Sequence, residues 1–274
     1  MELFKGKRGI VMGVANHMSL ATSIAKWLVT QGAEVGISYL QDAEGSNKMK
    51  ARALKATNDF PIQFCNPCDV SSDTSIDHFF SSVLEHWDSI DFLVHSIAFA
   101  PIADLKSPTI DVSRSGFIKS MDISCYSIIP LAKQAAQLMT NGGAICAMTY
   151  LGGEKVVPGY NLMGICKAAL ESTIQYLAYE LGKENIRING ISAGAVKTLS
   201  SSAVKDFKSL LSMSTEINPL QRATNIEDIA KSTGYLLSDM ASGVTGEIHH
   251  VDCGFNIMAA VNTKTSKSIP TAET

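Results

Sequence analysis

The sequence predicts a doubly wound α/β fold, in which one parallel sheet of seven strands carries helices on both faces. Between Arg8 and about Ile191, short β-like runs alternate with helical patterns, which is typical of βαβ units. Hydrophobic residues make up 46% of the 274 residues and charged residues only 18%, so the chain can bury a sheet on both sides. Single α/β domains often have this length, and we expect residues 1–262 to form one domain.

The first strand is expected at residues 9–12, an apolar run that stops at Gly13. The helix after it is predicted because Leu20, Ile24 and Leu28 fall on one stripe. By the same criteria, further strands are expected at residues 35–40, 62–68 and 91–97, with helices near residues 44–57 and 76–87.

A helix around residues 115–139 is expected to end at Asn141-Gly142-Gly143, before a strand at residues 144–149. A long helix from about residue 160 to 181 follows, and its apolar composition would suit a subunit interface as well as the sheet. The remaining elements are a strand at residues 187–191, a helix that begins near residue 226 and a strand at residues 246–251. Residues 263–274, rich in Thr, Ser and Lys, are expected to be disordered because they can bury little apolar surface.

Charge and hydropathy exclude several classes of protein. The formal net charge of −3 gives no basic surface for nucleic acid or for a membrane surface. No stretch reaches the roughly 18 apolar residues that span a bilayer, and the first eight residues lack the apolar core of a signal peptide. We therefore expect a cytoplasmic protein that binds neither nucleic acid nor membrane.

The six cysteines are expected to be free thiols, because a cytoplasmic chain of this size does not need disulfides. Cys65 and Cys68 have the C-x-x-C spacing of zinc and redox sites. No second such pair accompanies them, and they flank the end of an apolar run. The pattern therefore favours core packing, and we expect no metal site.

The turn between the first strand and its helix, residues 13–19, is a candidate cofactor site. Free backbone N–H groups and the helix dipole at such a turn favour a pyrophosphate. The turn contains Gly13, Ala15 and Ser19 but lacks the second and third glycines of G-x-G-x-x-G. A plain structural turn with a serine cap is therefore an equal alternative.

Two further strand ends carry candidate residues. Asp69 could accept a hydrogen bond from an adenine amino group or from neighbouring backbone, and a helix N-cap is the alternative role. The small residues within 95–101 would let a flat ring or a ribose approach the backbone closely. His95 itself lies in an apolar run and is expected to be a core histidine.

The strongest constellation is Tyr150, Tyr160 and Lys167, which fall at or just after the end of the fifth strand. A neighbouring ammonium stabilises a phenolate, so we expect Lys167 to lower the tyrosine pKa from about 10 toward the working pH. A lysine there can also hydrogen-bond the ribose of a nicotinamide cofactor. The structural alternative is an amphipathic helix start with an exposed lysine.

The seven-residue spacing of Tyr160 and Lys167 bears on the reaction. Along a helix, it returns a side chain to within about 20° of the same face but roughly 10 Å away, against about 6 Å for a four-residue spacing. Reduction of a conjugated enoyl thioester delivers hydride to the β-carbon, which leaves the carbonyl oxygen further from the nicotinamide than in ketone reduction. The spacing therefore favours enoyl reduction.

Together these segments resemble the enoyl-acyl-carrier-protein reductases of bacterial type II fatty-acid synthesis, a divergent branch of the short-chain dehydrogenase/reductases with a Rossmann-type sheet. The resemblance covers about residues 2–260. It is carried by residues 13–15 with Ser19, 68–70, 95–97 with 99–101, 150–152, 160–167 and 191–194. The usual tyrosine of the superfamily, four residues before the lysine, would fall at Met163, so the ketoreductase pattern is absent.

The resemblance implies NADH-dependent reduction of a trans-2-enoyl thioester on acyl carrier protein, the last reductive step of fatty-acid elongation, by a homotetramer. Tyr160 would hydrogen-bond or protonate the enolate, Lys167 would hold the cofactor ribose, and Tyr150 would shape the substrate site or assist proton delivery. Implied cofactor contacts are Gly13, Ala15, Ser19, Leu20, Leu40, Asp69, Val70, Ser96, Ile97, Ala98, Lys167, Val196 and Thr198. Implied substrate contacts are Ala100, Tyr150, Tyr160 and Phe207.

Residues 198–214, within the reductase domain, resemble the substrate-binding lid of the family. Serines and small residues allow this segment to move, and apolar side chains such as Phe207 could cover an acyl chain. Lys205 and Lys208 could meet the acidic carrier protein, or they could be solvated lysines on a surface helix.

Two other functions stay open. A short-chain ketoreductase would use the same fold, but the tyrosine spacing speaks against it. A catalytically silent dinucleotide-binding regulator would keep the cofactor pocket and need neither Tyr160 nor Lys167. Leu40 and Ala98 depart from residues common in the family, where glutamine and glycine occur, so the cofactor contacts at these two positions are open.

We predict a preference for NADH over NADPH. Residues 39–42, Tyr-Leu-Gln-Asp, offer no Arg or Lys to a 2′-phosphate at the end of the second strand. The specificity constants for the two cofactors, measured with one enoyl thioester, check the prediction. A higher specificity constant with NADPH would reject it.

Overall fold

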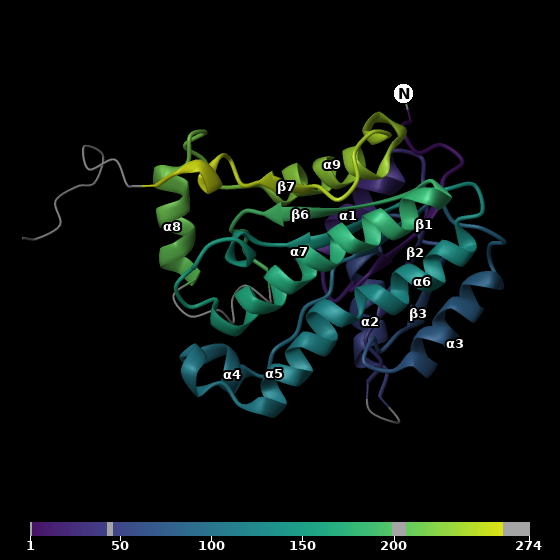
Figure 1. Ribbon diagram of the computed structural model, residues 1–274. Coiled ribbons are helices and arrows are strands. Elements are labelled where there is room, and N and C mark those ends of the chain that lie inside the picture. The colour runs from purple at the N-terminus through teal and green to yellow at the C-terminus, as the bar shows by residue number, and fades with distance from the viewer. Residues whose placement is uncertain (1, 43–45, 199–206, 260–274) are drawn as a thin grey trace, which may run out of the picture.

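The computed structural model describes residues 2–42, 46–198 and 207–259, with the side chains of residues 207–210 outside this description. Within it, one sheet has the strand order β3-β2-β1-β4-β5-β6-β7, and each neighbouring pair is parallel (Figure 1). The strands are β1 (Arg8–Met12), β2 (Glu34–Tyr39), β3 (Phe64–Pro67), β4 (Phe92–His95), β5 (Gly143–Thr149), β6 (Ile186–Ala193) and β7 (Ile248–Val251). The predicted doubly wound sheet of seven strands is confirmed.

The order of the strands reverses beside β1. The chain runs outward from β1 through β2 and β3, then crosses back to build β4 to β7 on the other side. Met12 and His95, the last residues of β1 and β4, are register partners, so the two strands finish side by side. In open α/β sheets, ligands bind beyond the carboxyl ends of strands at such a reversal.

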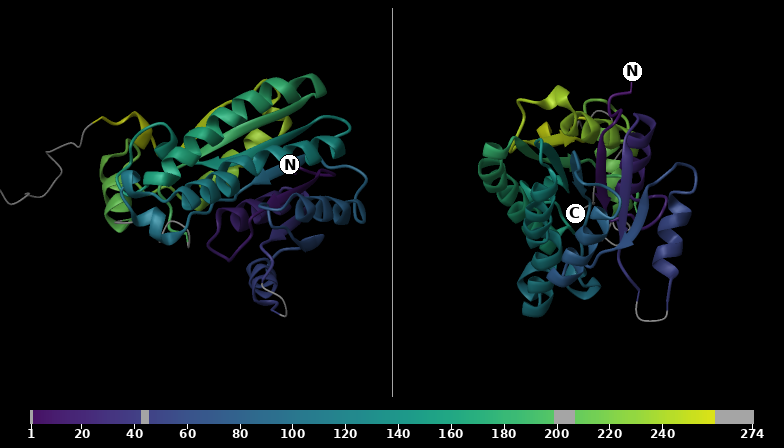
Figure 2. Two further views of the ribbon diagram at one scale, coloured as in Figure 1. Left: turned by 60° about the horizontal axis from the view of Figure 1, so that its bottom comes forward. Right: turned by 90° about the vertical axis from the view of Figure 1, so that its right-hand side faces the viewer.

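Helices cover both faces of the sheet. Figure 1 looks onto the face that carries α3, α6 and α7, while α1 and α9 lie behind it. Figure 1 and the left view of Figure 2 place α4, α5 and α8 toward the end where the strands finish. The helices are α1 (Leu20–Thr30), α2 (Lys48–Ala56), α3 (Asp73–Leu84), α4 (Ile102–Lys106), α5 (Arg114–Met121), α6 (Ile128–Leu138), α7 (Asn161–Leu181), α8 (Phe207–Ile217) and α9 (Ile226–Leu237).

The two faces of the sheet bury separate hydrophobic cores. Successive side chains of a strand point to opposite faces, so Ile10 enters one core and Val11 the other. Ile10 shares its core with Leu170 of α7, and Val11 shares the second core with Ile24 of α1. All of these side chains are fully buried, which explains why the strands read as continuous apolar runs.

Serine and asparagine caps fix where several helices begin. Ser19 accepts a hydrogen bond from the Thr22 N–H at the start of α1, and Ser72 plays the same part for α3. The alternative role of Asp69 as a helix N-cap is therefore wrong. Its carboxylate instead accepts hydrogen bonds from the N–H and the hydroxyl of Ser71, at 3.0 and 2.7 Å.

The expected single helix over residues 115–139 is wrong, because a π-helical segment, Asp122–Tyr126, separates α5 from α6. Pro130 stands in the first turn of α6 and has no N–H to donate to the carbonyl four residues earlier. The widened turn also places Ser124 against the backbone of Phe99. The Ser124 hydroxyl accepts a hydrogen bond from the Phe99 N–H and donates one to the Phe99 carbonyl, at 2.9 Å each. Sequence periodicity alone does not show this change of register.

The contact between α1 and α9 predicts the effect of one substitution. A Cβ built on Gly234 would lie 1.9 Å from Cζ3 of Trp27. We expect Gly234→Ala to lower the free energy of unfolding by about 1–3 kcal/mol, because the two helices must move apart. Gly182→Ala is the matched control, since nothing lies within 4 Å of its built Cβ. Urea unfolding that leaves Gly234→Ala as stable as the wild type would contradict the packing.

Candidate active site

A cavity of 370 Å³ lies at the carboxyl ends of β1, β4, β5 and β6. It brings together residues that are far apart in the sequence, from the turn after β1 to the segment after β6. Of the site residues expected from the sequence, those that line it are Gly13, Ala15, Ser19, Leu20, Ser96, Ile97, Ala98, Ala100, Tyr150, Tyr160, Lys167, Val196 and Thr198.

Three expected site residues, Leu40, Asp69 and Val70, do not line this cavity, and a fourth cannot be placed. Leu40 and Asp69 follow β2 and β3, on the other side of β1, and Leu40 is 54% exposed. Val70 is buried in the core between the sheet and α3. Phe207 begins α8, but its side chain lies outside the described residues.

Several lining residues were not expected. Met148 and Thr149 end β5, and residues 193–195 follow from β6, so the strand ends were the signal that could have identified them. Ile102 and Leu105 belong to α4, a helix of five residues between two prolines that no hydrophobic period reveals. The remaining unexpected lining residues are Asn16, Phe99 and Met163.

Gly13 forms a wall of the cavity without a side chain. Its φ is +89°, and a Cβ at this position would lie 2.3 Å from the carbonyl oxygen of Ser96. A side chain is excluded both by this conformation and by the close approach of the two strand ends. The backbone beyond β1 is therefore open to a flat group, and α1 begins directly after it with the Ser19 cap.

Tyr150 and Tyr160 pack against each other at one side of the cavity. Their ring centroids lie 4.7 Å apart, with the planes at 68°. Tyr160 is the N-cap of α7, and Asn161 after it has a φ of +33°. A Cβ on Gly152 would lie 2.3 Å from Cδ1 of Tyr160, so this glycine leaves room for the ring.

The seven-residue spacing of Tyr160 and Lys167 does not act as it would within one helix, so the expected helical relation is wrong. Tyr160 precedes α7, so the angle per residue of a helix does not fix its direction relative to Lys167. The ring position is set instead by its contacts with Tyr150 and Gly152.

Lys167 is buried at the cavity, with only 4% of its surface exposed. Its Nζ donates a hydrogen bond of 2.7 Å to the carbonyl oxygen of Met148. Burial lowers the pKa of Lys167 to about 8. The alternative of an exposed lysine at a helix start is therefore wrong.

The expectation that Lys167 lowers the tyrosine pKa is also wrong. Burial raises the pKa of Tyr150 to about 12, with a further contribution from the negative charge of Asp252. Burial raises the pKa of Tyr160 as well. Both rings are therefore neutral phenols near pH 7, able to donate a hydrogen bond. The cost of burying a phenolate outweighs the attraction of the ammonium.

His95 is a core histidine, as expected, and is fully buried. Its Nε2 lies 2.8 Å from the hydroxyl of Ser127, while Nδ1 has no hydrogen-bond partner among the described residues. Burial lowers the pKa of His95 to about 3, with a further contribution from the charge of Lys167. The imidazole is therefore neutral beside the site.

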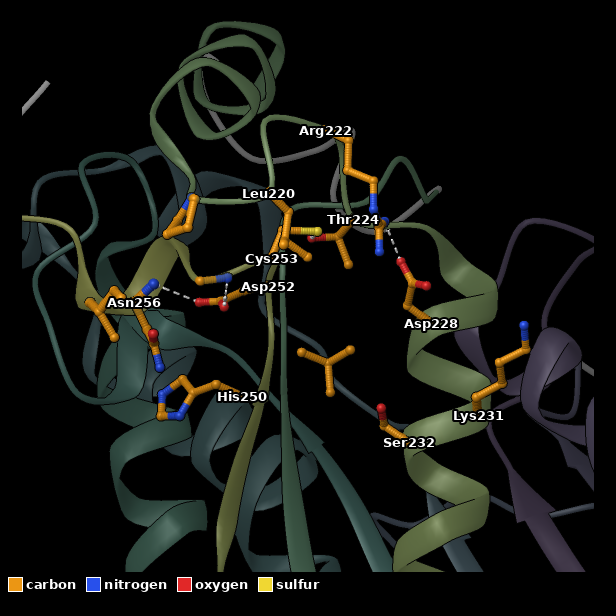
Figure 3. Close-up of a pocket in the computed structure, with 14 residues that line it drawn as sticks. Leu220, Arg222, Thr224, Asp228, Lys231, Ser232, His250, Asp252, Cys253 and Asn256 are labelled. Atoms are coloured by element: carbon orange, nitrogen blue, oxygen red, sulfur yellow. Dashed lines mark hydrogen bonds and ion pairs between the residues drawn. The ribbon is translucent and has the colours of Figure 1, made fainter. Parts of the chain in front are cut away.

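A second cavity of 630 Å³ lies between β7 and α9 (Figure 3). Several of its polar groups pair with one another. Arg222 forms an ion pair with Asp228, and the Asp252 carboxylate accepts from the N–H groups of Gly254 and Asn256. With the tyrosines and Lys167 gathered in the first cavity, we place the reaction there.

The cysteines and the helices add no further site. All six cysteines are free, and Cys68 is buried in a hydrophobic core. In the described part of the chain, no three His, Cys, Asp or Glu side chains gather as a metal site would require. No helix in the same part combines the length and hydropathy needed to cross a bilayer.

The close approach of Gly13 to Ser96 predicts that a side chain at position 13 weakens cofactor binding. We expect Gly13→Ala to weaken NADH binding by about tenfold or more, equivalent to about 1.4 kcal/mol, because the added Cβ pushes apart the ends of β1 and β4. Gly6→Ala is the matched control, since Gly6 also has a positive φ, of +75°, but nothing lies within 4 Å. Fluorescence titration with NADH measures both, and equal affinities would contradict the role of the close approach.

Comparisons with known proteins agree with the reductase site expected at this cavity. A family model described as enoyl-(acyl carrier protein) reductase matches residues 13–256. The chain is 44% identical to the NADH-dependent enoyl-[acyl-carrier-protein] reductase FabI of Rickettsia conorii, over 94% of this chain and 97% of that protein. It is 45% identical to enoyl-[acyl-carrier-protein] reductase [NADH] 1 of Rhizobium meliloti, over 93% of this chain and 92% of that protein.

Solved structures show the same similarity. FabI from Candidatus Liberibacter asiaticus has a TM-score of 0.90 and 43% identity, covering 95% of this chain and 99% of that chain. The enoyl-(acyl-carrier-protein) reductase of Anaplasma phagocytophilum, solved in complex with NAD, has a TM-score of 0.89 and 46% identity, covering 95% and 97%. The chain therefore belongs to the enoyl-(acyl carrier protein) reductase family.

Proposed function

We propose that this protein is an NADH-dependent enoyl-acyl-carrier-protein reductase, which reduces the trans-2 double bond of an enoyl thioester in the last reductive step of fatty-acid elongation. The observation that carries the proposal is the gathering of Tyr150, Tyr160 and Lys167 around one cavity at the strand ends. The names of the relatives support the reaction, and the Anaplasma phagocytophilum complex supports NAD as the cofactor.

The cavity suits a dinucleotide. Gly13 gives it a wall without a side chain, and the N-terminus of α1 at Ser19 offers N–H groups to a pyrophosphate. Lys167 presents a buried ammonium that would hold the nicotinamide ribose. Bound NADH would supply the hydride that adds to the β-carbon of the substrate.

The end of β2 supports NADH over NADPH. Residues 39–42 contain no Lys or Arg, and the Asp42 carboxylate accepts a hydrogen bond of 2.6 Å from the Met49 N–H. A carboxylate at this place would repel a 2′-phosphate. We propose that Leu40, Asp69 and Val70 border the adenosine part of the cofactor, outside the cavity that holds the reacting groups.

The two neutral phenols and the lysine suit an enolate mechanism. Addition of hydride at the β-carbon moves the electrons of the double bond onto the thioester oxygen. Tyr160 would donate a hydrogen bond to this oxygen, and the charge of Lys167 would stabilise it electrostatically. Protonation of the α-carbon then gives the saturated acyl thioester, and Tyr150 would shape the site or assist this proton delivery.

The alternative functions fit the site less well. Met163 stands four residues before Lys167, where a ketoreductase carries tyrosine, and its buried thioether has no proton to give. A silent dinucleotide-binding regulator would need neither a buried lysine nor a tyrosine pair. Both features favour the reductase.

Acyl carrier protein and three further copies of the chain are the proposed partners. Lys205 lies outside the described residues, as does the side chain of Lys208, so docking of the carrier protein there stays a prediction. Leu170 and Ile174, which were expected to suit either an interface or the sheet, pack in the core of this chain. Exposed aromatic side chains of α7 instead support self-association, since Tyr176 is 69% and Tyr179 86% exposed.

The remaining proposals concern the ends of the chain and its location. We propose that residues 198–214 act as the lid of domain 1–262, with α8 placed toward the strand ends as a lid requires. The expected disorder of residues 263–274 falls outside the described residues. Cytoplasmic location completes the proposal.

We expect the purified protein to oxidise NADH with crotonyl coenzyme A or a longer enoyl thioester, followed by absorbance. Tyr160→Phe should lower kcat by about 100-fold or more, because it removes the donor to the enolate oxygen. Lys167→Ala should lower turnover through lost cofactor binding and lost charge. The control substrate is a 3-oxoacyl thioester, and comparable turnover of both thioesters would refute enoyl reduction as the specific function.

A further inference from the structure

Glu171 is a buried carboxyl on α7 that the mechanism above does not use. Only 8% of its surface is exposed. Its Oε1 accepts a hydrogen bond of 2.6 Å from the hydroxyl of Thr149. A Cβ on Gly153 would lie 2.7 Å from the same oxygen, so the chain leaves room for this carboxylate. The site is built to hold an acid at this position.

Two consecutive residues at the end of β5 hold an amine and a carboxyl group. The Met148 carbonyl accepts from Lys167 Nζ at 2.7 Å, and the Thr149 hydroxyl donates to Glu171 at 2.6 Å. Residues four apart lie on the same face of a helix, so Lys167 and Glu171 reach one strand end together. A buried ammonium without an opposite charge is costly, and a neighbouring carboxylate offsets that cost.

Two other groups beside Lys167 are neutral near pH 7. Burial raises the pKa of the Cys166 thiol to about 11 and lowers that of His95 to about 3. Cys125 adds a buried thiol, whose Sγ lies 3.6 Å from Oγ1 of Thr173. Among the described groups that act on Lys167, Glu171 is the one carboxyl.

Glu154 and His250 also act on Glu171. His250 Nε2 lies 2.7 Å from Glu154 Oε1, and His250 also lines the second cavity, where Figure 3 shows it. Burial raises the pKa of Glu171 most, and Glu154 raises it further, whereas Lys167 and His250 lower it.

We propose that Glu171 is a positioning residue that acts through Lys167. Its carboxylate, which accepts from Thr149 in the space left by Gly153, keeps the buried ammonium protonated and directed at the end of β5 during turnover. The inference rests on the proposed function for its role in the reaction. The charge relationship itself can be measured without turnover.

The test is a pH titration of Lys167 in Glu171→Gln. Glutamine keeps the shape and the acceptor for Thr149 but removes the charge. The 13Cε resonance of Lys167, identified by its loss in Lys167→Arg, should titrate about one pH unit or more below the wild type. The reaction needs the protonated amine, so kcat of the wild type falls as pH rises through about 8, and in Glu171→Gln this fall should move to lower pH by the same amount.

Two control variants separate the effect of the Glu171 charge on the Lys167 titration from the effect of the side-chain shape. Glu171→Asp keeps the charge but shortens the side chain, so Lys167 should titrate closer to the wild type than in Glu171→Gln. Glu180→Gln makes the same chemical change on the exposed face of α7 and should leave the titration unchanged. If Lys167 titrates in Glu171→Gln as it does in the wild type, the proposal is overturned. A shift of the Lys167 titration in Glu171→Asp as large as that in Glu171→Gln would also overturn it.

A measurement on the wild type covers the case in which Glu171→Gln does not fold. The 13Cδ resonance of Glu171, identified by its change in Glu171→Asp, should report an ionised carboxyl at pH 7. A protonated Glu171 at that pH overturns the proposal. A wild type that oxidises no NADH with enoyl thioesters refutes the proposed function instead, and the two titrations still decide the role of Glu171.

Discussion

The hydrogen bond from Lys167 to the Met148 carbonyl is the contact on which the geometry of the site depends. Met148 lies in β5, whose neighbours β4 and β6 pair with it on both sides, so the accepting oxygen is fixed by the sheet. α7 must therefore approach β5 closely enough for a buried ammonium to reach it. Loss of this contact would leave a charge without a partner in the interior, which costs several kcal/mol.

The balance of charge in the site follows from burial. Exclusion of water penalises phenolate and ammonium alike, but the ammonium has a carbonyl and a neighbouring carboxylate to stabilise it. Among the described residues, no cation lies within hydrogen-bond distance of either phenol. The outcome is two neutral donors next to one positive charge. Such an arrangement stabilises negative charge that develops on a substrate oxygen, without an ionised tyrosine in the resting protein.

Local sequence patterns were sufficient for the sheet, and together with the family resemblance they were sufficient for most of the cavity wall. Apolar runs and glycine stops predict strands, and the ends of parallel strands meet at one edge, which located Gly13, Ser96 and Lys167. The missed features depend on contacts between distant segments. Burial of Tyr160 reverses the expected direction of its pKa shift, and the π-helical segment Asp122–Tyr126 interrupts a helix that its periodicity would continue.

The π-helical segment Asp122–Tyr126 limits how the length of this chain can change in evolution. It positions Ser124 against the Phe99 backbone at the cavity, and Ser127, directly after it, against His95 in the core. Removal of one residue would turn α6 by about 100° relative to α5 and carry the apolar stripe of α6 away from the sheet. Selection should therefore purge insertions and deletions here, while it tolerates them in surface turns, so descendants of this chain are expected to keep the same count between α5 and α6.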